Sequence, residues 1–239
     1  MTVERVADGP SPFDRFAREY DEWFTGGGRL VFATEVEAFR RVVQGLPGPW
    51  LEIGVGSGRF AEALGIESGI DPSVKLLEMA RTRGVGAVLA GGEQQPFRAA
   101  SFGTAFLIVT LCFLHRPGDV LREAARVVIP DGKVVLGLVL KDSPWGRFYR
   151  EKGEQGHRFY RHATFYGYDE LVALLRVAGF GVERVVSTLL KSPGSVDRKE
   201  EPREGYIPDA GFTVVVAAKE RRHTDFQARP QDSRDRLLP

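Results

Sequence analysis

The stretch WLEIGVGSGRFA, residues 50–61, places three glycines at alternate positions behind a short apolar segment that carries one acid. The glycines are Gly54, Gly56 and Gly58, and the acid is Glu52, two residues before the first glycine. A strand, a glycine-rich turn and a helix in this order form an anion site, because bare backbone lets a ligand approach the free N–H groups. The stretch therefore predicts a ligand-binding turn, although a tight turn without a ligand fits the same pattern.

Strand-like and helix-like segments alternate on both sides of this turn. Short apolar segments predict seven strands, at residues 48–55, 68–72, 86–91, 101–114, 133–140, 182–190 and 212–219. Apolar residues at helical spacing predict helices between them, at residues 59–65, 73–84 and 168–180, and a helix followed by a turn within residues 117–132. The alternation predicts an α/β fold with a mostly parallel sheet and helices on both faces. Because no helix separates the last two strands, the final strand is predicted to be antiparallel.

The chain is predicted to form a single domain over residues 1–219. Two amphipathic helices are expected within residues 11–46, where they would cap the sheet. Residues 141–168 form an aromatic and basic insertion after the fifth strand. Residues 220–239 have few apolar side chains, many charges and no periodicity, which predicts a disordered tail.

Composition and charge narrow the class of protein. Hydrophobic residues make up 43% and charged residues 27% of the 239 residues, which is typical of a globular chain. The 33 basic and 32 acidic residues nearly cancel, so a nucleic-acid partner is not favoured. Cys112 is the only cysteine, no secretory signal is recognisable, and the longest apolar run, residues 105–114, is about half the length of a membrane span. These features predict a cytoplasmic protein without a membrane segment.

Two classes of cofactor fit the glycine turn. Gly56, Gly58 and Ala61 match the dinucleotide pattern G-x-G-x-x-A, which leaves an NAD-dependent oxidoreductase open. Asp71 follows the second predicted strand, where its carboxylate would bind both hydroxyls of a ribose in either cofactor, or would cap the next helix. Glu52 argues against the dinucleotide, because a dehydrogenase usually carries an apolar residue at that position.

Five segments taken together resemble one family. They read LEIGVGSG, GIDPS, GGEQQPF, LREAARVVIPDGKVVLG and LLRVAGF, and they are similar to the class I S-adenosylmethionine-dependent methyltransferases of the methyltransferase type 11 group. The resemblance covers about residues 13–219. It implies a Rossmann-like fold, S-adenosyl-L-methionine as the cofactor, methyl transfer by in-line displacement, and binding of the cofactor's ribose hydroxyls by Asp71.

The resemblance implies roles for further residues around the cofactor. Backbone N–H groups from Gly54 to Gly58 suit the methionine carboxylate, and Glu52 would compensate the nearby ammonium. Tyr20 lies in YDEWF, which resembles the entry motif of related enzymes, and would close over the methionine end. The complete set of cofactor-binding candidates is Tyr20, Glu52, Gly54, Gly56, Ser57, Gly58, Asp71, Gly92, Glu93, Gln94 and Thr110.

The predicted adenine side departs from the family pattern. Similar sequences often read D-A-E-x-L-P-F after the third strand, where the Asp meets the adenine amino group, but Gly91 stands at that position here. The backbone around Gly92 and Glu93, or the Gln94 side chain, is expected to take over this contact.

No residue stands out as a strong catalytic group. His115, just beyond the fourth strand, is the best-placed candidate base, although a surface histidine is the commoner case. Cys112 lies in the same apolar segment and is expected to be a core residue. The segment carries neither a Pro-Pro-Tyr type motif nor an acid that would ligate magnesium, so no metal and no nucleic-acid acceptor are expected.

The insertion is expected to cover the methyl acceptor together with the N-terminal helices. Its acceptor candidates are Trp145, Tyr149, Tyr160 and Tyr166, whose rings can stack on a ligand or attract a cation. Its cations either recognise an acidic group or form a solvated face; they are Arg147, Arg150, Lys152, Arg158 and Arg161. The predicted reaction is methylation of a small molecule on nitrogen or oxygen. An NAD-dependent oxidoreductase and a non-catalytic S-adenosylmethionine-binding protein are the alternatives.

Overall fold

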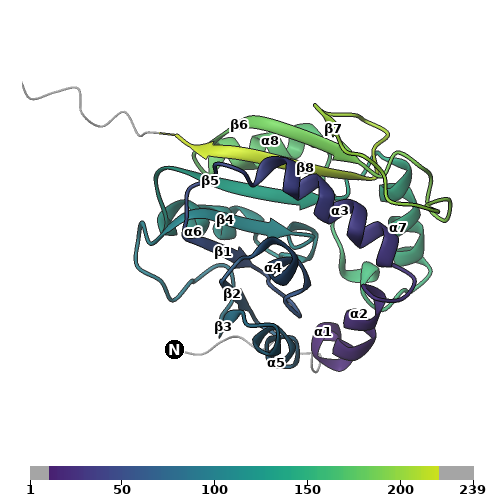
Figure 1. Ribbon diagram of the computed structural model, residues 1–239, viewed down its shortest axis with the longest axis horizontal. Coiled ribbons are helices and arrows are strands. Elements are labelled where there is room, and N and C mark those ends of the chain that lie inside the picture. The colour runs from purple at the N-terminus through teal and green to yellow at the C-terminus, as the bar shows by residue number, and fades with distance from the viewer. Residues whose placement is uncertain (1–10, 221–239) are drawn as a thin grey trace, which may run out of the picture.

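The structure is a computed structural model that describes residues 11–220. Its strands form one sheet, whose neighbours follow the order β3-β2-β1-β4-β5-β8-β6-β7 (Figure 1). The strands are β1 (Trp50–Ile53), β2 (Ser68–Asp71), β3 (Gly86–Leu89), β4 (Phe102–Ile108), β5 (Val128–Leu138), β6 (Phe180–Thr188), β7 (Arg203–Glu204) and β8 (Phe212–Lys219). Each of the strands predicted from the sequence is present.

The sheet is mostly parallel. β3, β2, β1, β4 and β5 pair in parallel, whereas β8 pairs antiparallel with β5 on one side and with β6 on the other. The predicted fold class, including the antiparallel last strand, is confirmed. The sheet has eight strands rather than seven, because Arg203 and Glu204 pair with Ser187 and Val186 at the edge beyond β6. This short strand lies in a polar segment without alternation, so no sequence pattern predicted it.

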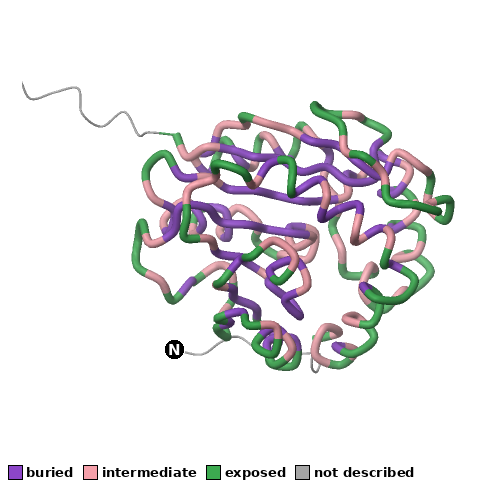
Figure 2. The backbone as a smooth tube through the Cα atoms, viewed as in Figure 1, coloured by how far each residue is buried: buried purple, intermediate pink, exposed green. Residues whose placement is uncertain are grey.

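Helices cover both faces of the sheet (Figure 1). α3, α4 and α5 contribute to the apolar cluster on one face, and α6 and α8 contribute to the cluster on the other. The buried residues of α6 are Val120, Leu121, Ala124 and Val127, a spacing that gives the helix one apolar stripe. The helices are α1 (Pro12–Arg15), α2 (Ala17–Trp23), α3 (Arg29–Val42), α4 (Arg59–Leu64), α5 (Val74–Thr82), α6 (Pro117–Val127), α7 (Pro144–Glu154) and α8 (Tyr168–Val177), with short 3-10 helices η1 (Leu111–Phe113) and η2 (Tyr160–His162). Figure 2 shows the buried strands between these layers.

The N-terminal region contains three helices rather than two. Phe16 leaves the helical conformation (φ −120°, ψ 31°) and separates α1 from α2, which the spacing of the aromatic residues did not reveal. α3 packs against β6 and β8, so it covers the sheet itself. α1 and α2 lie beyond the ends of the strands (Figure 1).

The insertion at 141–168 contains α7 and η2, for which the sequence analysis assigned no element. α7 begins after Ser143, whose hydroxyl accepts a hydrogen bond from the Gly146 N–H (3.0 Å), and Pro144 occupies the first turn. Trp145 fixes the helix by donating its indole N–H to the Lys191 carbonyl (2.8 Å). α7 is thereby held against the loop between β6 and β8.

Two predictions concern the chain ends and the membrane. The tail predicted to be disordered begins at residue 220; the Glu220 N–H bonds to the Gly179 carbonyl (2.9 Å), and residues 221–239 lie outside the described part. Within residues 11–220, none of the helices is both long and apolar enough to span a membrane.

Candidate active site

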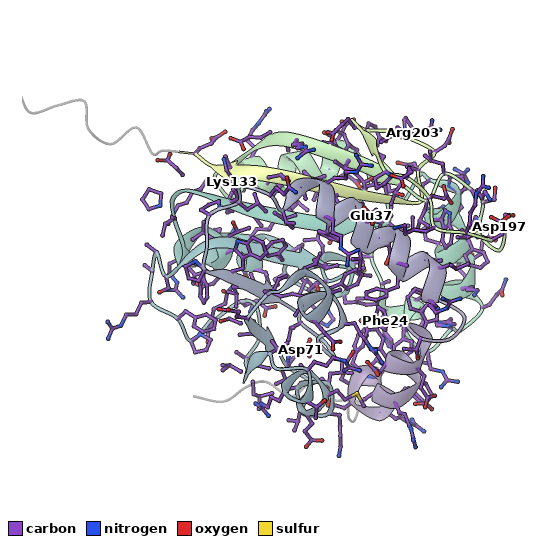
Figure 3. All side chains as sticks on the ribbon, in the orientation of Figure 1. Phe24, Glu37, Asp71, Lys133, Asp197 and Arg203 are labelled. Atoms are coloured by element: carbon purple, nitrogen blue, oxygen red, sulfur yellow. The ribbon has the colours of Figure 1, made fainter. Side chains whose placement is uncertain are left out.

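The glycine turn lies where the strand order of the sheet reverses. From β1 the order continues to β2 and β3 on one side, and to β4 and β5 on the other. The carboxyl ends of β1 and β4 therefore border the crevice that open α/β sheets use for ligands. Thr110, just after β4, donates its hydroxyl hydrogen to the Gly54 carbonyl (3.3 Å) and ties the two strand ends together. Figure 3 shows Asp71 on the side of the molecule where α1 and α2 lie.

The turn requires glycine at two positions for conformational and packing reasons. Gly54 has φ +77°, in the left-handed region, and a Cβ there would lie 2.4 Å from Thr110 Cγ2. Gly58 (φ +82°) is the N-cap of α4, and its Cβ would lie 2.9 Å from the Cα of Ala80. The glycine spacing seen in the sequence thus reflects backbone conformation and close packing together.

Asp71 holds the turn from the end of β2. Its Oδ2 accepts a hydrogen bond from the Gly56 N–H (2.9 Å), and its Oδ1 accepts one from the Ser73 N–H (2.8 Å). Burial raises the pKa of Asp71 to about 6, and these two donors oppose the shift. A carboxylate offers about four acceptor positions, so Asp71 can hold the turn and also accept hydrogen bonds from ligand hydroxyls.

Glu52 is a buried carboxyl group beneath the turn. Its side chain is 1% exposed, and its Oε2 has no hydrogen bond partner among residues 11–220. Burial, followed by the charge of Asp71, raises the pKa of Glu52, and the backbone of Ala61 opposes the shift. Two carboxyl groups in one buried region create a site that favours a positively charged ligand group.

Tyr20 lies over the turn. A Cβ at Gly56 would be 3.6 Å from the Tyr20 ring atom Cε1. Burial, followed by the charges of Asp71 and Glu52, raises the pKa of Tyr20, so its hydroxyl stays protonated at neutral pH. The ring meets Phe159 of the insertion at 5.7 Å between centroids. α2 and the insertion therefore meet above the glycine turn.

Phe13 joins the segments that cover the turn. Its ring stacks on Phe159 with 5.2 Å between centroids and meets Phe113 edge to face at 5.0 Å. It also meets Tyr20 at 5.5 Å. α1, α2, η1 and the insertion thus share one aromatic cluster, which excludes water from this end of the sheet.

Asp21 fixes α2 to the rest of the site. Its carboxylate accepts hydrogen bonds from both Arg59 at the start of α4 (2.8 and 2.6 Å) and Arg83 after α5 (2.9 Å). Burial alone would raise the pKa of Asp21, but the hydrogen bonds from Arg59 and the charge of Arg83 hold it below its usual value. Arg83 also donates to the Ser57 carbonyl (2.6 Å), so the glycine turn and α2 share one network.

The Asp21→Asn variant is expected to lower the free energy of unfolding by about 1–3 kcal/mol, because charge-assisted hydrogen bonds to two arginines are lost. Urea denaturation measures this difference. Glu22→Gln on the same helix is the matched control, since its pair with Arg18 is exposed and should contribute less than about 1 kcal/mol. Equal losses in the two variants would contradict the role of Asp21.

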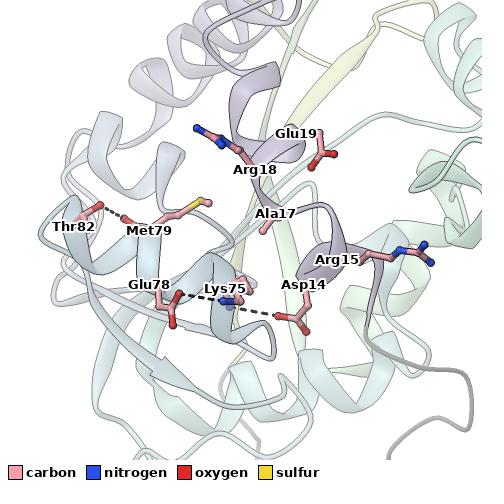
Figure 4. A pocket seen from close by; sticks show the side chains of 9 residues that line it. All are labelled: Asp14, Arg15, Ala17, Arg18, Glu19, Lys75, Glu78, Met79 and Thr82. Carbon is pink, nitrogen blue, oxygen red and sulfur yellow. Dashed lines mark hydrogen bonds and ion pairs between the residues drawn. The ribbon is translucent and has the colours of Figure 1, made fainter.

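α1 is held against α5 by Asp14. The Asp14 carboxylate accepts hydrogen bonds from the Ser73 hydroxyl (2.7 Å) and the Lys75 N–H (3.4 Å). Figure 4 shows the groove of ≈ 400 Å³ that lies between these helices, lined by both acidic and basic side chains. The groove lies on the outer side of α5, so its residues position the cover of the site and do not form the glycine turn.

The predicted adenine residues lie beside the end of β1. A Cβ at Gly92 would contact Ile53 Cγ2 (3.2 Å) and Val120 Cγ1 (2.9 Å). Glu93 and Gln94 border a depression of ≈ 280 Å³ against α6. The buried amide in this segment belongs to Gln95, whose Oε1 has no hydrogen bond partner within the described residues 11–220. Gln94 was expected to make the contact to adenine. Gln95 stands where the family pattern D-A-E-x-L-P-F has its leucine, and this polar residue at an apolar position was the signal in the sequence that points to Gln95.

The catalytic candidates differ in exposure. His115 is exposed on the segment after η1. Cys112 is half-buried, and burial raises the pKa of its thiol to about 12, so it stays protonated. Among residues 11–220, no group of three or more His, Cys, Asp or Glu side chains is arranged to hold a metal ion.

The His115→Ala variant is expected to keep kcat within about threefold of the wild-type value, because an exposed imidazole cannot hold a fixed position against the acceptor. Steady-state kinetics with an acceptor that supports turnover measure this ratio. A loss of about a hundredfold, the low end for a general acid or base, would make His115 the base.

The four acceptor candidates lie in two environments. Trp145 is a core residue, packed so closely that a Cβ at Gly211 would lie 2.2 Å from its ring. Tyr149 and Tyr160 are neighbours with ring centroids 4.4 Å apart. Tyr166 is half-buried, and burial is the main cause of its raised pKa.

Several cations of the insertion have local partners. Arg158 lies over the Phe16 ring (4.5 Å) and pairs with Glu19 (3.6 Å). Lys152 lies over the Phe148 ring at 4.4 Å. These two side chains contribute to the packing of α1, α2 and α7. For Arg158 and Lys152 this favours the prediction of a solvated face over recognition of an acidic group.

Glu35 is a buried acid that the sequence analysis missed. It lies on α3 between Val31 and Phe39, four residues from each, on the face that packs on the sheet, and it is 5% exposed. Burial raises the pKa of Glu35 to about 8. The signal was available, because an acid stands on the apolar stripe of the helix where the pattern requires an apolar residue.

Stability should fall with rising pH because of Glu35. A carboxyl group with a raised pKa binds more protons in the folded state, so its stabilising effect is complete below about pH 4.5 and is lost as the pH rises through about 8. Relative to Glu35→Gln, the wild type should lose about 3–5 kcal/mol of unfolding free energy between pH 4.5 and 8. Urea denaturation of both proteins across this range measures the change, and a constant difference would contradict it.

Comparison with known proteins identifies the class of enzyme. The family described as a methyltransferase domain matches residues 51–136, from β1 into β5. A solved structure from Thermotoga maritima, described as a SAM-dependent methyltransferase and possible histamine N-methyltransferase, has a TM-score of 0.82 and 36% sequence identity, covering 87% of this chain and 99% of that one. The chain belongs to the class I S-adenosylmethionine-dependent methyltransferases.

Two further relatives are similar over most of their length. An uncharacterized protein of Mycobacterium tuberculosis is 38% identical over 98% of this chain and 82% of its own length. An uncharacterized protein of Methanocaldococcus jannaschii is 36% identical over 87% of this chain and 98% of its own. The descriptions of these two relatives name no methyl acceptor.

Proposed function

We propose that the protein transfers the methyl group of S-adenosylmethionine to nitrogen or oxygen of a small-molecule acceptor. The observation that carries this proposal is the buried Oε2 of Glu52 beneath the glycine turn, which has no hydrogen bond partner in the part of the chain that the structure describes. The ammonium group of the cofactor's methionine part would neutralise this carboxyl, whereas the pyrophosphate of NAD would add negative charge beside it.

Complementary groups are available for each part of the cofactor. The bare backbone of the turn suits the methionine carboxylate, and Asp71 suits the ribose hydroxyls. Gly92 and its neighbours are assigned to adenine, and Tyr20 is assigned to the methionine end, which it covers. When bound, S-adenosylmethionine supplies a methyl group activated by its sulfonium.

The residues of the chain contribute alignment and exclusion of water. The aromatic cluster of Phe13, Tyr20, Phe113 and Phe159 closes this end of the sheet, so a reaction there proceeds away from solvent. Holding two reactants in the correct orientation can lower a barrier by about 7–11 kcal/mol. An acceptor that binds as an anion or as a neutral amine does not require a strong general base.

A small molecule fits the site better than a polymer. The net charge of the chain is +1, which provides no general attraction for nucleic acid. Aromatic side chains from α1, α2, η1 and the insertion enclose the region beside the turn, which suits an acceptor that can be covered. The Thermotoga maritima relative, described as a possible histamine N-methyltransferase, is consistent with such an acceptor.

Release of S-adenosylhomocysteine tests the acceptor class. The protein is incubated with S-adenosylmethionine and separate pools of metabolites, tRNA and protein, with a sample lacking any acceptor as the control. We expect turnover with the metabolite pool. Turnover confined to the tRNA or protein pool would contradict a small-molecule acceptor, and S-adenosylmethionine binding without turnover in any pool would favour a non-catalytic role.

A further inference from the structure

The segment that follows β3 lies beside the acid assigned to the ribose. The Ala90 N–H donates to the main-chain carbonyl of Asp71 (3.2 Å), so the chain leaves β3 next to the end of β2. A Cβ at Gly92 would lie 3.2 Å from Cγ2 of Ile53, the residue before the glycine turn. The segment therefore passes from the end of β2 to the end of β1. A nucleoside whose ribose is held by the Asp71 carboxylate can place its base against this segment.

An adenine base needs a hydrogen bond acceptor at this place. Its exocyclic amino group is a donor, and a donor that loses water without gaining a partner weakens binding. The family pattern has an aspartate at residue 91, but Gly91 has no side chain. The Gly92 carbonyl already accepts a hydrogen bond from the Gln95 side-chain amide (3.1 Å). The acceptor for the amino group must therefore come from another side chain of the segment.

The Glu93 carboxylate lies in the space that an aspartate at residue 91 would use. A Cβ at Gly91 would lie 3.2 Å from Glu93 Oε2. Apart from atoms of the adjoining residues, this oxygen is the only atom of the described chain within 4 Å of that Cβ. Glycine at residue 91 thus leaves room for the Glu93 carboxylate at the place where the missing side chain would begin.

The Glu93 carboxylate is available to a ligand. The residue is half-buried and borders the depression of ≈ 280 Å³ against α6. Within residues 11–220, the Glu93 side chain makes neither an ion pair nor a hydrogen bond. The two arginines that line the same depression, Arg116 and Arg122, both pair with Asp119. The carboxylate oxygens of Glu93 therefore keep their acceptor capacity.

α6 fixes the segment on which Glu93 lies. The Gln95 N–H donates to Glu123 Oε2 (3.1 Å), and Arg126 donates to the Gln95 carbonyl (3.0 Å). The bond from the Gln95 amide to Gly92 fixes the backbone on the other side of Glu93. Gln95 Oε1 is itself fully buried, so a ligand reaches the half-buried Glu93 carboxylate more easily. Gln95 is a positioning residue for Glu93.

Building on the proposed function, we propose that the Glu93 carboxylate binds the exocyclic amino group of adenine, in place of the acid missing at residue 91. The amino group donates one hydrogen to a carboxylate oxygen, and such a charge-assisted bond is about twice as strong as a neutral one. The contact selects a base that carries an amino group over one that lacks it. Glu93 thereby determines the specificity of the cofactor site for adenine.

Calorimetry with two ligands that differ in one group tests this contact. The ligands are S-adenosylhomocysteine and its analogue with hydrogen in place of the adenine amino group. The measured quantity is the ratio of their dissociation constants, which requires no methyl acceptor and no turnover. The variants of the full chain are Glu93→Ala, Glu93→Gln, and Gly91→Asp combined with Glu93→Ala. Glu67→Ala is the matched control, because Glu67 is exposed and precedes β2, at the end of the strand away from the site.

Wild type and Glu67→Ala should bind S-adenosylhomocysteine at least about tenfold more tightly than the analogue. In Glu93→Ala the ratio should fall to within about twofold of one, while the affinity for the analogue stays within about threefold of wild type. Glu93→Gln keeps a neutral acceptor and should give an intermediate ratio. Adding Gly91→Asp to Glu93→Ala should restore a ratio of at least about fivefold, because the new carboxylate enters the space that Glu93 has left.

Three results would overturn the role of Glu93. They are a wild-type ratio near one, a Glu93→Ala ratio equal to that of wild type, and an equal loss of affinity for both ligands in Glu93→Ala, which would indicate a structural role. A double variant without any restored ratio would show that the space beside Gly91 does not face the amino group, and would also overturn it. If S-adenosylhomocysteine does not bind to the wild type at all, the proposed function itself fails.

Discussion

Replacing Asp71 by alanine is expected to weaken S-adenosylmethionine binding by at least about a hundredfold. The variant removes the acceptor of the Gly56 N–H and Ser73 N–H groups and the carboxylate assigned to the ribose. Hydrogen bonds to a charged group contribute about 1.5–3 kcal/mol each, and a hundredfold change in affinity corresponds to about 2.7 kcal/mol. Isothermal titration calorimetry measures the dissociation constant.

Two variants separate ligand binding from structure. Asp71→Asn keeps the volume but replaces one acceptor oxygen with an amino group, so it should weaken binding without opening a cavity. Asp169→Ala removes an exposed acid at the start of α8, far along the chain, and should leave binding unchanged. Circular dichroism confirms that each variant is folded. A dissociation constant for Asp71→Ala within about threefold of wild type would show that Asp71 serves only the turn.

Replacing Gly54 by alanine is expected to lower the free energy of unfolding by about 2–5 kcal/mol. A left-handed backbone costs a non-glycine residue about 1–2 kcal/mol, and overpacking adds about 1–3 kcal/mol. The added Cβ would lie 2.4 Å from Thr110 Cγ2 and 2.5 Å from Thr110 Oγ1. Thr110 cannot move away freely, because its single hydroxyl hydrogen lies within reach of both the Gly54 and the Ile108 carbonyls (3.3 and 3.1 Å).

A double-mutant cycle isolates the clash. Thr110→Ala removes the two closest atoms and leaves its Cβ 3.0 Å away, so Gly54→Ala should cost less in that background, by about 1–3 kcal/mol. Gly65→Ala is the matched control, since Gly65 has φ +76° with nothing within 4 Å of its added Cβ. It should show the backbone cost alone. Additive effects of the Gly54 and Thr110 changes would contradict the packing explanation.

The sequence contained enough information for the core of the fold. Two features followed from capping and apolar periodicity: Ser73 as the N-cap of α5, with its hydroxyl accepting from the Leu76 N–H (3.3 Å), and the places of the main strands along the chain. The break at Phe16 and the strand at Arg203 and Glu204 did not follow, because both depend on tertiary contacts in segments without a regular pattern.

Some residues of the candidate site were likewise predicted from the sequence, whereas others were not. The glycine turn, Glu52 and Asp71 were predicted because they are close in the sequence or follow adjacent strands. Asp21 was missed because its arginine partners lie 38 and 62 residues away. Glu35 carried a local signal, an acid on an apolar stripe, but the extent of its burial becomes apparent only in the folded chain.

Calorimetric titration of the full chain with S-adenosylmethionine and, separately, with NADH tests the central claim most directly. The buried acid beneath the glycine turn and the assigned ribose acceptor Asp71 predict saturable binding of S-adenosylmethionine at one site per chain, and no saturable binding of NADH. Saturable binding of NADH without binding of S-adenosylmethionine would contradict the account.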